Sequence, residues 1–339
     1  MFWKLVTFII VIVITPICMS LSMSQGTPIP SPIQLSFREN IYTKVTSSSL
    51  TKDLPNVVFI HGLDSSSHTW RDILVQVEEF TKAIAFDMRG CGTSPLADAD
   101  EFSPDNIVQD IHYSLLQHPE FCNSGNIHPF VIVGHSMGAR IAMSFALAYP
   151  ALIKALVVED MDIRQRPLSM NVFRNPDRNR GDIISFNRDL KVSCEEKVKD
   201  IFEREGYPRE LVSKWLKEGR VHINDKRDDN TVSSYYYSEV NPAFRLLCYE
   251  QFFIPNHGEE VFTKLAKQEE NYPIHVFVAD REMTVCSEES LWEMKKIMNE
   301  NSRFMAIHRY PGATHSIHNS ANELFLKDLH TILKTSSLQ

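Results

Sequence analysis

The sequence predicts an α/β fold: a mostly parallel sheet of about eight strands, with helices on both faces and an inserted helical cap. Two observations lead to this prediction. From Val57 onward, short apolar runs alternate with longer amphipathic stretches, and the short runs carry no polar side. Strands that are apolar on both faces suit a sheet covered by helices on each side. Alternating strands and helices imply parallel strands joined by right-handed crossovers.

The predicted strands are short and are bounded by glycine, proline or charged residues. An antiparallel pair, Gln34–Phe37 and Tyr42–Val45, precedes the regular alternation. The parallel strands are predicted at Val57–Ile60, Ala83–Phe86, Phe130–Val133, Ala155–Val158, Ile274–Val278 and Met305–Ile307.

Three helices between these strands have clear sequence signals. Ser103 followed by Pro104 is a typical N-cap and first-turn proline. A helix from Met137 to Tyr149 must end before Pro150. The last helix, Asn322 to Leu333, places its apolar residues on one face.

The alternation breaks between Ile163 and about Glu270, where two helical patterns follow a basic loop. A helical insertion over the carboxyl ends of parallel strands is typical of a cap. We interpret the arginines between Arg164 and Arg180 as a solvated face rather than a site for an acidic substrate. The predicted organisation is a leader at 1–24, the first part of the core at 25–162, the cap at 163–270 and the second part of the core at 271–339.

The amino-terminal segment has the pattern of a signal peptide. A basic start at Met1–Lys4 precedes the apolar run Leu5–Ile17, and small residues follow. Pro16 shortens the apolar part below the roughly 20 residues that a membrane span needs, so we favour a signal peptide over an anchor. We therefore expect entry into the secretory pathway, although a bipartite organelle leader has the same pattern. Five of the six cysteines follow this leader, so at least one has no partner within a monomer.

The net charge of −8 argues against a nucleic acid or an anionic membrane as partner, because an acidic surface repels both. The only membrane contact we expect is through an uncleaved leader. The expected partner is a small-molecule acyl substrate, and no cofactor is implied. Composition does not predict the oligomeric state.

The strongest motif is Gly134-His135-Ser136-Met137-Gly138, which follows an apolar strand and runs directly into a helix. In a turn this tight, larger side chains two residues before and after the serine would collide with neighbouring backbone. The turn exposes the serine at the tip of the sheet, near a helix N-terminus. The sequence therefore predicts Ser136 as a nucleophile.

A serine nucleophile needs a base, and position selects His315 from the chain's 13 histidines. His315 lies between the last predicted strand and the last helix, at the sheet edge where Ser136 also lies. His318 is expected to support it, while His61 and His135 flank glycine turns and are expected to orient loops. The spacing of His315 and His318 lacks the accompanying glutamate of a zinc-protease motif, so we predict no metal site.

The run Val57–Ile60 ends in His61-Gly62-Leu63, a strand end that lets the next backbone N–H turn toward the nucleophile. We predict that the N–H groups of Leu63 and Met137 form the oxyanion hole. Backbone donors leave the two side chains available to line an acyl pocket.

These blocks, together with Asp87-Met88-Arg89-Gly90-Cys91-Gly92-Thr93-Ser94, resemble the α/β-hydrolase superfamily from about Asn56 to Leu333. The resemblance implies a serine hydrolase, with Asp87–Ser94 as a structural turn. His61-Gly62-Leu63-Asp64-Ser65-Ser66 and Thr69-Trp70 are most similar to the small acyl-ester hydrolases, the esterase and lipase-like branch.

The third triad member departs from the superfamily's usual pattern. Most members carry an aspartate after the seventh strand, where this chain reads Ala279-Asp280-Arg281-Glu282. A minority take the acid from the end of the sixth strand, and this position is Asp160 here. The small acyl-ester hydrolases that this chain resembles belong to this minority. We favour Asp160, with Glu282 as the alternative and Asp280 third; any of these carboxylates could orient the histidine.

The resemblance and the residues together predict a serine hydrolase that cleaves a carboxylic ester or thioester through an acyl-enzyme. Other reactions remain open: an amidase or aminopeptidase, or a carbon–carbon bond hydrolase. A receptor that traps its ligand on the same fold is the alternative that is not an enzyme.

Overall fold

The central sheet of the computed structural model is mostly parallel, as predicted. Residues 31–40, 54–166, 179–185, 189–191, 195–204, 206–218, 221–228, 231–238 and 240–338 are described. Residues 32–339 form one compact unit. The leader at 1–24 and the predicted strand Tyr42–Val45 lie outside the described residues.

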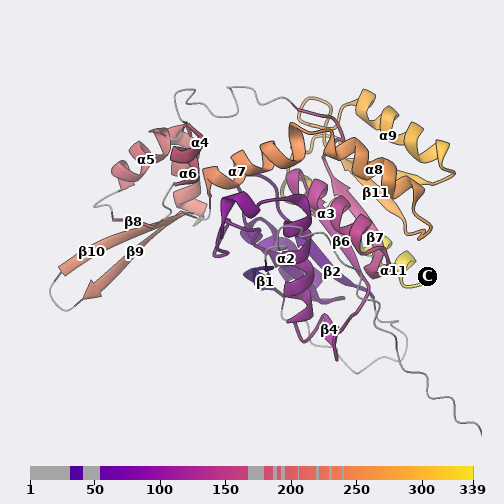
Figure 1. Cartoon of the computed structure of the whole chain (residues 1–339), viewed down its shortest axis with the longest axis horizontal. Coiled ribbons are helices and arrows are strands. Elements are labelled where there is room, and N and C mark those ends of the chain that lie inside the picture. Colours follow the sequence, from indigo (N-terminus) through magenta and orange to yellow (C-terminus); the bar gives the residue numbers. More distant parts are fainter. Residues whose placement is uncertain are drawn as a thin grey trace, which may run out of the picture. The chain divides into compact units, whose positions relative to one another are not determined.

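Seven strands form the sheet in the described part of the chain, in the order β1-β3-β2-β6-β7-β11-β12 (Figure 1). β1 pairs antiparallel with β3, and the other neighbours are parallel. The strands are β1 (Phe37–Glu39), β2 (Asn56–Ile60), β3 (Ala83–Phe86), β6 (Phe130–His135), β7 (Ile153–Glu159), β11 (Ile274–Val278) and β12 (Met305–Arg309).

Alternate residues of the central strands enter different apolar cores. Val58 and Ile60 belong to the core on one face, and Val57 and Phe59 to the core on the other. This period of two explains why the strand sequences are apolar throughout. Helices therefore cover both faces, as the sequence predicted.

The first face is covered by helices that contribute apolar side chains to the larger core. They are α2 (Pro104–Leu116), α3 (Met137–Ala148), α7 (Pro242–Cys248), the π-helix η4 (Tyr249–Phe253), α8 (His257–Lys267) and α9 (Glu288–Glu300). The short β4 (Cys122–Asn123) and β5 (Asn126–Ile127), with the single turns η2 (Ala99–Glu101) and η3 (Pro150–Leu152), connect elements here.

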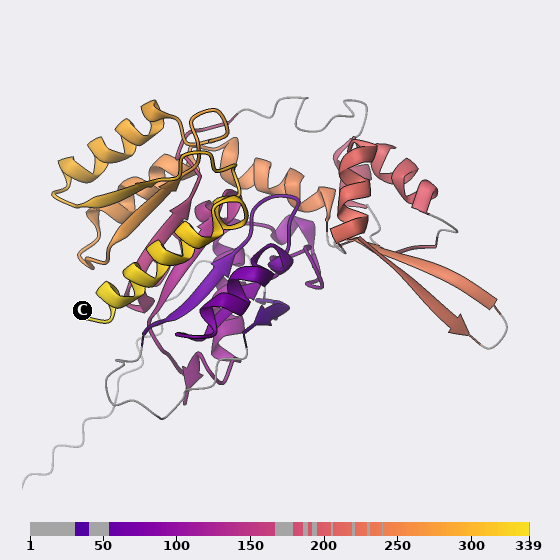
Figure 2. The same ribbon diagram turned by 180° about the vertical axis from the view of Figure 1, so that it is seen from behind.

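The second face carries α11 (Asn322–Ser336), which runs across the sheet in Figure 2, and α1 (Arg71–Val77). η1 (Ser67–Trp70) precedes α1, and α10 (Ile317–Ser320) precedes α11. Trp70 stacks between Phe59 and His318, with ring centroids 4.7 and 4.1 Å apart.

The cap is smaller than the sequence predicted and is not wholly helical. It contains α4 (Arg180–Ile184), β8 (Asp189–Lys191), α5 (Glu195–Arg204), α6 (Arg209–Glu218), β9 (Val221–Asp228) and β10 (Thr231–Ser238). β8, β10 and β9 form a three-stranded antiparallel sheet. The aromatic run at 235–237 lies on β10, which fits the high strand propensity of tyrosine.

Among the described residues, the cap's own apolar cluster extends from Val198 to Val240. Ile163 and the apolar side chains of α7, η4 and α8 instead belong to the main core. The predicted limits 163–270 therefore included core helices. A search of the described helices finds none that is long and apolar enough to span a bilayer.

Candidate active site

Ser136 lies in a sharp turn between β6 and α3. Its backbone has φ 53° and ψ −121°, a conformation that is rare outside glycine. A Cβ added at Gly134 would come within 2.3 Å of Gly138 O, and one added at Gly138 within 2.4 Å of Ile60 O. The glycine spacing of the motif is therefore a steric requirement. Ser136 N–H donates to Glu159 O at 2.9 Å, which ties the turn to the end of β7.

His315 lies in the loop between β12 and α10, and its side chain is 33% exposed. Its Nδ1 lies 2.6 Å from Asp160 Oδ2. This contact fixes the ring so that Nε2 is the nitrogen available for proton transfer. His315 and Ser136 line the same cavity.

Asp160 directly follows β7 and is fully buried, with a φ of 46°. Besides His315, its carboxylate accepts bonds from Ala279 N–H (3.1 Å), Val285 N–H (3.2 Å) and the Thr284 hydroxyl. Burial by itself raises the pKa of Asp160. The bonds from His315, Thr284 and Ala279 outweigh burial and hold this pKa below its ordinary value. The carboxylate is therefore ionised at neutral pH.

The other two candidate acids lie at the surface in the turn after β11. The side chain of Glu282 is exposed. Asp280 accepts bonds from Gly312 N–H at 2.8 Å and Glu282 N–H at 3.3 Å, and these bonds lower its pKa. The carboxylate that the structure brings to His315 is that of Asp160.

The two predicted oxyanion donors lie beside Ser136. Met137 is the first residue of α3, where an N–H has no partner within the helix. Gly62 packs so closely that an added Cβ would lie 3.0 Å from Ser136 Cβ. Leu63 follows it and lines the cavity, as expected for an acyl pocket. The side chain of Met137 does not, because it is fully buried in the main core.

The cavity over Ser136 and His315 has a volume of about 830 Å³. Its apolar lining from the core includes Met161, Phe253 and Val285. Leu211 and Trp215 of α6 line it as well, so the cap contributes to the pocket. None of these five residues was singled out as pocket-lining from the sequence, because no local pattern marks a residue as facing a cavity.

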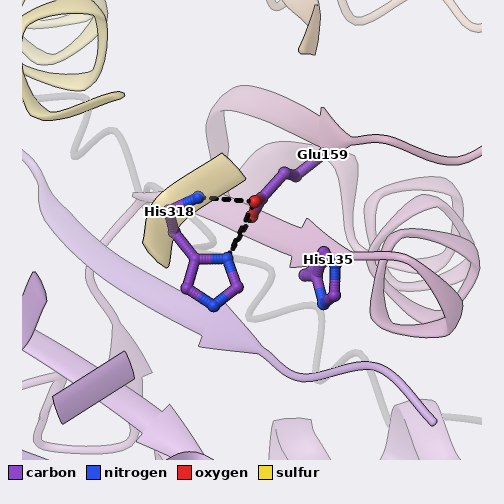
Figure 3. A group of neighbouring side chains, drawn as sticks. All are labelled: His135, Glu159 and His318. Atoms are coloured by element: carbon purple, nitrogen blue, oxygen red, sulfur yellow. Dashed lines mark hydrogen bonds and ion pairs between the residues drawn. The ribbon is translucent and has the colours of Figure 1, made fainter. Parts of the chain in front are cut away.

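A second histidine–carboxylate pair is formed by His318 and by Glu159, the residue before Asp160 (Figure 3). His318 donates its backbone N–H to Glu159 Oε1 at 2.9 Å, and its Nδ1 lies 2.8 Å from the same oxygen. Both side chains are fully buried. His318 Nε2 contacts Thr69 Oγ1 at 2.8 Å, which links the pair to η1. As expected, His318 lies near the site without lining the cavity. Its carboxylate partner, Glu159, was not predicted from the sequence.

His135 completes a buried group with Glu159 and His318, and their ligand-type atoms lie within 4.8 Å of one another. These residue types can bind a metal. Here the Glu159 carboxylate is engaged by His318 Nδ1 and by the His318 backbone N–H, and His318 Nε2 lies against Thr69 Oγ1. Burial lowers the pKa of His135 to about 3, and its Nε2 lies 3.0 Å from His315 O. His135 is thus a neutral support for the His315 loop.

Two further polar residues hold the loops around the site. His61 is buried, and its Nε2 accepts a bond from Met88 N–H at 3.0 Å, so it orients a loop as predicted. Asp87 accepts bonds from Ser67 N–H at 2.7 Å and Thr93 N–H at 3.0 Å. A structural role for the turn at Asp87–Ser94 fits these contacts.

We predict that Glu159→Gln lowers the free energy of unfolding at pH 7 by about 1–3 kcal/mol, the usual cost of a weakened buried bond to a charged group. Burial alone raises the pKa of Glu159, but His318 outweighs burial and holds this pKa below its ordinary value. A carboxylate with a depressed pKa stabilises the fold above its unfolded pKa of about 4.3, and this contribution disappears as the pH falls through the folded pKa. Urea denaturation at pH values from 7 to 3 measures the free energy of unfolding of both proteins. The difference between Glu159→Gln and wild type should become smaller as the pH falls. Glu289→Gln, at an exposed position, is the matched control; a difference that grew in acid would contradict the prediction.

Comparisons with known proteins identify the fold family. The α/β-hydrolase-fold family matches residues 55–318. A protein of Shigella dysenteriae that is assigned as the carbamate hydrolase RutD is 32% identical over 31% of this chain. The matched segment spans 44% of that protein. The solved structure of E-2-(acetamidomethylene)succinate hydrolase has a TM-score of 0.58 and 15% identity, covering 88% of this chain and 95% of that one. A marine microorganism esterase has a TM-score of 0.57 and 19% identity, covering 88% and 99%. The chain belongs to the α/β-hydrolase-fold family.

Proposed function

We propose that the protein is a serine hydrolase that cleaves carboxylic esters or thioesters through an acyl-enzyme. The observation that carries the proposal is that Ser136, in its strained turn, and His315, held by Asp160, line one cavity. A nucleophile, a base and an oriented acid around one opening are the parts that acyl transfer needs.

In the proposed mechanism, Ser136 Oγ attacks the acyl carbonyl while His315 Nε2 takes its proton. Asp160 stabilises the imidazolium that forms, and the N–H groups of Leu63 and Met137 bind the oxyanion. His315 then gives the proton to the leaving group. Water, activated by the same histidine, attacks the acyl-enzyme and releases the acid.

The names of the relatives support hydrolysis at an acyl carbon, but they differ in the kind of bond that is cleaved. The names given above are those of a carbamate hydrolase, an acetamidomethylene succinate hydrolase and an esterase. Carbamate cleavage is the second candidate, because the match to RutD is at 32% identity. It would use the same residues, and Ser136 would then carry a carbamoyl group instead of an acyl group.

The test is labelling with a fluorophosphonate probe, followed by turnover of p-nitrophenyl esters of increasing chain length and of a p-nitrophenyl carbamate. We expect Ser136 to label in the folded protein and not after heat denaturation, with mass spectrometry locating the adduct. Repeated turnover of the esters supports an esterase. Faster turnover of the carbamate would replace the ester assignment, and release of a single equivalent of p-nitrophenol with each substrate would favour a ligand-trapping receptor. Failure of the folded protein to label would overturn the proposal.

A further inference from the structure

The cavity over Ser136 is basic, although the whole chain carries a net charge of −8. Its acidic lining residues are Asp64 and Asp72. Its basic lining residues are Arg71, Arg166, Lys214, Lys217 and Arg245.

Solvent or a neighbouring carboxylate compensates most of this positive charge. Arg71 Nε lies 3.0 Å from Asp72 Oδ1 in an exposed pair. Arg245 Nε donates to Asp64 Oδ1 at 3.1 Å. Lys214 and Lys217 are exposed on α6, where water screens their charges. Arg166 differs from these four.

Arg166 shares its carboxylate with a second arginine. Arg166 Nη2 lies 2.9 Å from Asp162 Oδ2, and Arg140 Nη2 lies 3.2 Å from Asp162 Oδ1. Arg140 is fully buried. Two guanidinium groups therefore share the single carboxylate of Asp162 at the wall of the cavity. The nearby carboxylate of Asp160 is engaged by His315, Thr284 and backbone N–H groups.

The guanidinium of Arg166 also has an N–H donor without an acceptor among the described residues. Its Nη2 makes the contact with Asp162 and a 3.3 Å bond to Val285 O. Its Nε–H is buried and has no hydrogen-bond partner among the described residues. An unpaired buried donor is unfavourable, and an acceptor on a bound ligand would remove that cost. The apolar neighbours Phe253 and Val285 strengthen an electrostatic contact there by excluding water.

We propose that Arg166 is an anion-binding position that selects acyl substrates bearing a carboxylate. The guanidinium fork matches the two oxygens of a carboxylate, and Arg166 lines the same cavity as the nucleophile. The inference rests on the proposed serine hydrolase function. It also revises our interpretation of the basic loop for this arginine, which lines the cavity. Arg164, by contrast, is paired outside the cavity with Glu289 and Glu293 at 3.1 and 3.0 Å.

The test compares mono-p-nitrophenyl adipate with its neutral methyl ester, which has the same acyl chain. We expect wild-type kcat/KM for the anionic ester to exceed that for the neutral ester by roughly ten-fold or more, as a charge-assisted hydrogen bond allows. Sodium chloride should reduce this ratio. Arg166→Gln should lower the ratio of kcat/KM for the anionic ester to kcat/KM for the neutral ester close to the ratio of their rates of alkaline hydrolysis. Arg166→Lys, which keeps the positive charge beside Asp162, should retain part of the preference for the anionic ester. Arg164→Gln is the matched control and should keep the wild-type ratio.

The outcomes separate this inference from the proposed function. If Ser136 labels with fluorophosphonate but wild type shows no preference for the anionic ester, the anion site is wrong and the serine hydrolase assignment stands. A preference that survives in Arg166→Gln equally overturns the role of Arg166. If Ser136 does not label, both proposals fail. Should Arg166→Gln not fold, the ratio in Arg166→Lys and its dependence on salt decide the question.

Discussion

Replacing Ser136 by alanine is expected to lower kcat for ester hydrolysis by about 10⁶-fold, the effect typical of losing the nucleophile of a serine triad. Without Oγ no acyl-enzyme forms, and the remaining rate comes from binding and the oxyanion donors. The variant keeps the small side chain that this turn needs at φ 53°. We therefore expect it to fold as well as wild type. The measurement is steady-state hydrolysis of a p-nitrophenyl ester beside the unfolding midpoint.

Ser144→Ala provides the matched control, because Ser144 lies on the same helix and its hydroxyl bonds to Arg140 O rather than facing the cavity. This variant should retain activity within a few-fold. Hydrolysis by Ser136→Ala at near the wild-type rate would show that another group is the nucleophile. Loss of activity together with loss of folding would be uninformative, so the circular dichroism of both variants is recorded first.

The candidate nucleophile Ser136 could be located from the sequence because its signals are local. Gly134 and Gly138 are required by contacts with backbone on either side of the turn, so five consecutive residues carry the information. The apolar strand before the turn and the helix after it are equally local. The structure places Ser136 between β6 and α3, as these signals predicted.

The acid could not be fixed in the same way, because it depends on which strand end faces the His315 loop. β7 and β11 are neighbours in the sheet, and a carboxylate follows each of them in the sequence. The choice is made by tertiary contacts: Asp160 turns inward at φ 46°, where Thr284 and two backbone N–H groups from the segment after β11 bind it. The segment that carries Glu282 thus helps to hold Asp160.

Glu159 and the strands of the cap escaped prediction for different reasons. A charge at the end of an apolar strand normally faces solvent, and only the fold shows that His318 lies against it. In the cap, the helical patterns and the basic loop do not reveal strands, although the propensity of the tyrosine run at 235–237 favours β10. Its partner β9 has a mostly polar sequence, and edge strands outside a large core lack the apolar alternation that marks a strand.

Asp160→Asn is expected to lower kcat by about 10⁴-fold while the ground-state geometry of the site is largely kept. All four groups around the carboxylate, including His315 Nδ1 at 2.6 Å, are placed to donate. An amide has one acceptor oxygen, so its NH₂ faces either Ala279 N–H and the Thr284 hydroxyl or Val285 N–H and His315. The second arrangement removes the bond that holds the Nδ1-protonated tautomer, and in both arrangements the imidazolium loses its negative partner. Steady-state kinetics should show the loss in kcat rather than in KM.

Glu282→Gln distinguishes the two acids that the sequence left open. Its side chain is exposed, and the change removes charge without altering size, as Asp160→Asn does. We expect kcat within about two-fold of wild type, since surface substitutions usually have small effects. A large loss in Glu282→Gln with a small one in Asp160→Asn would mean that the contact between His315 and Asp160 is structural. Equal large losses would mean that the turn after β11 positions Asp160 through Thr284 and Val285, and Thr284→Val would then reproduce the effect.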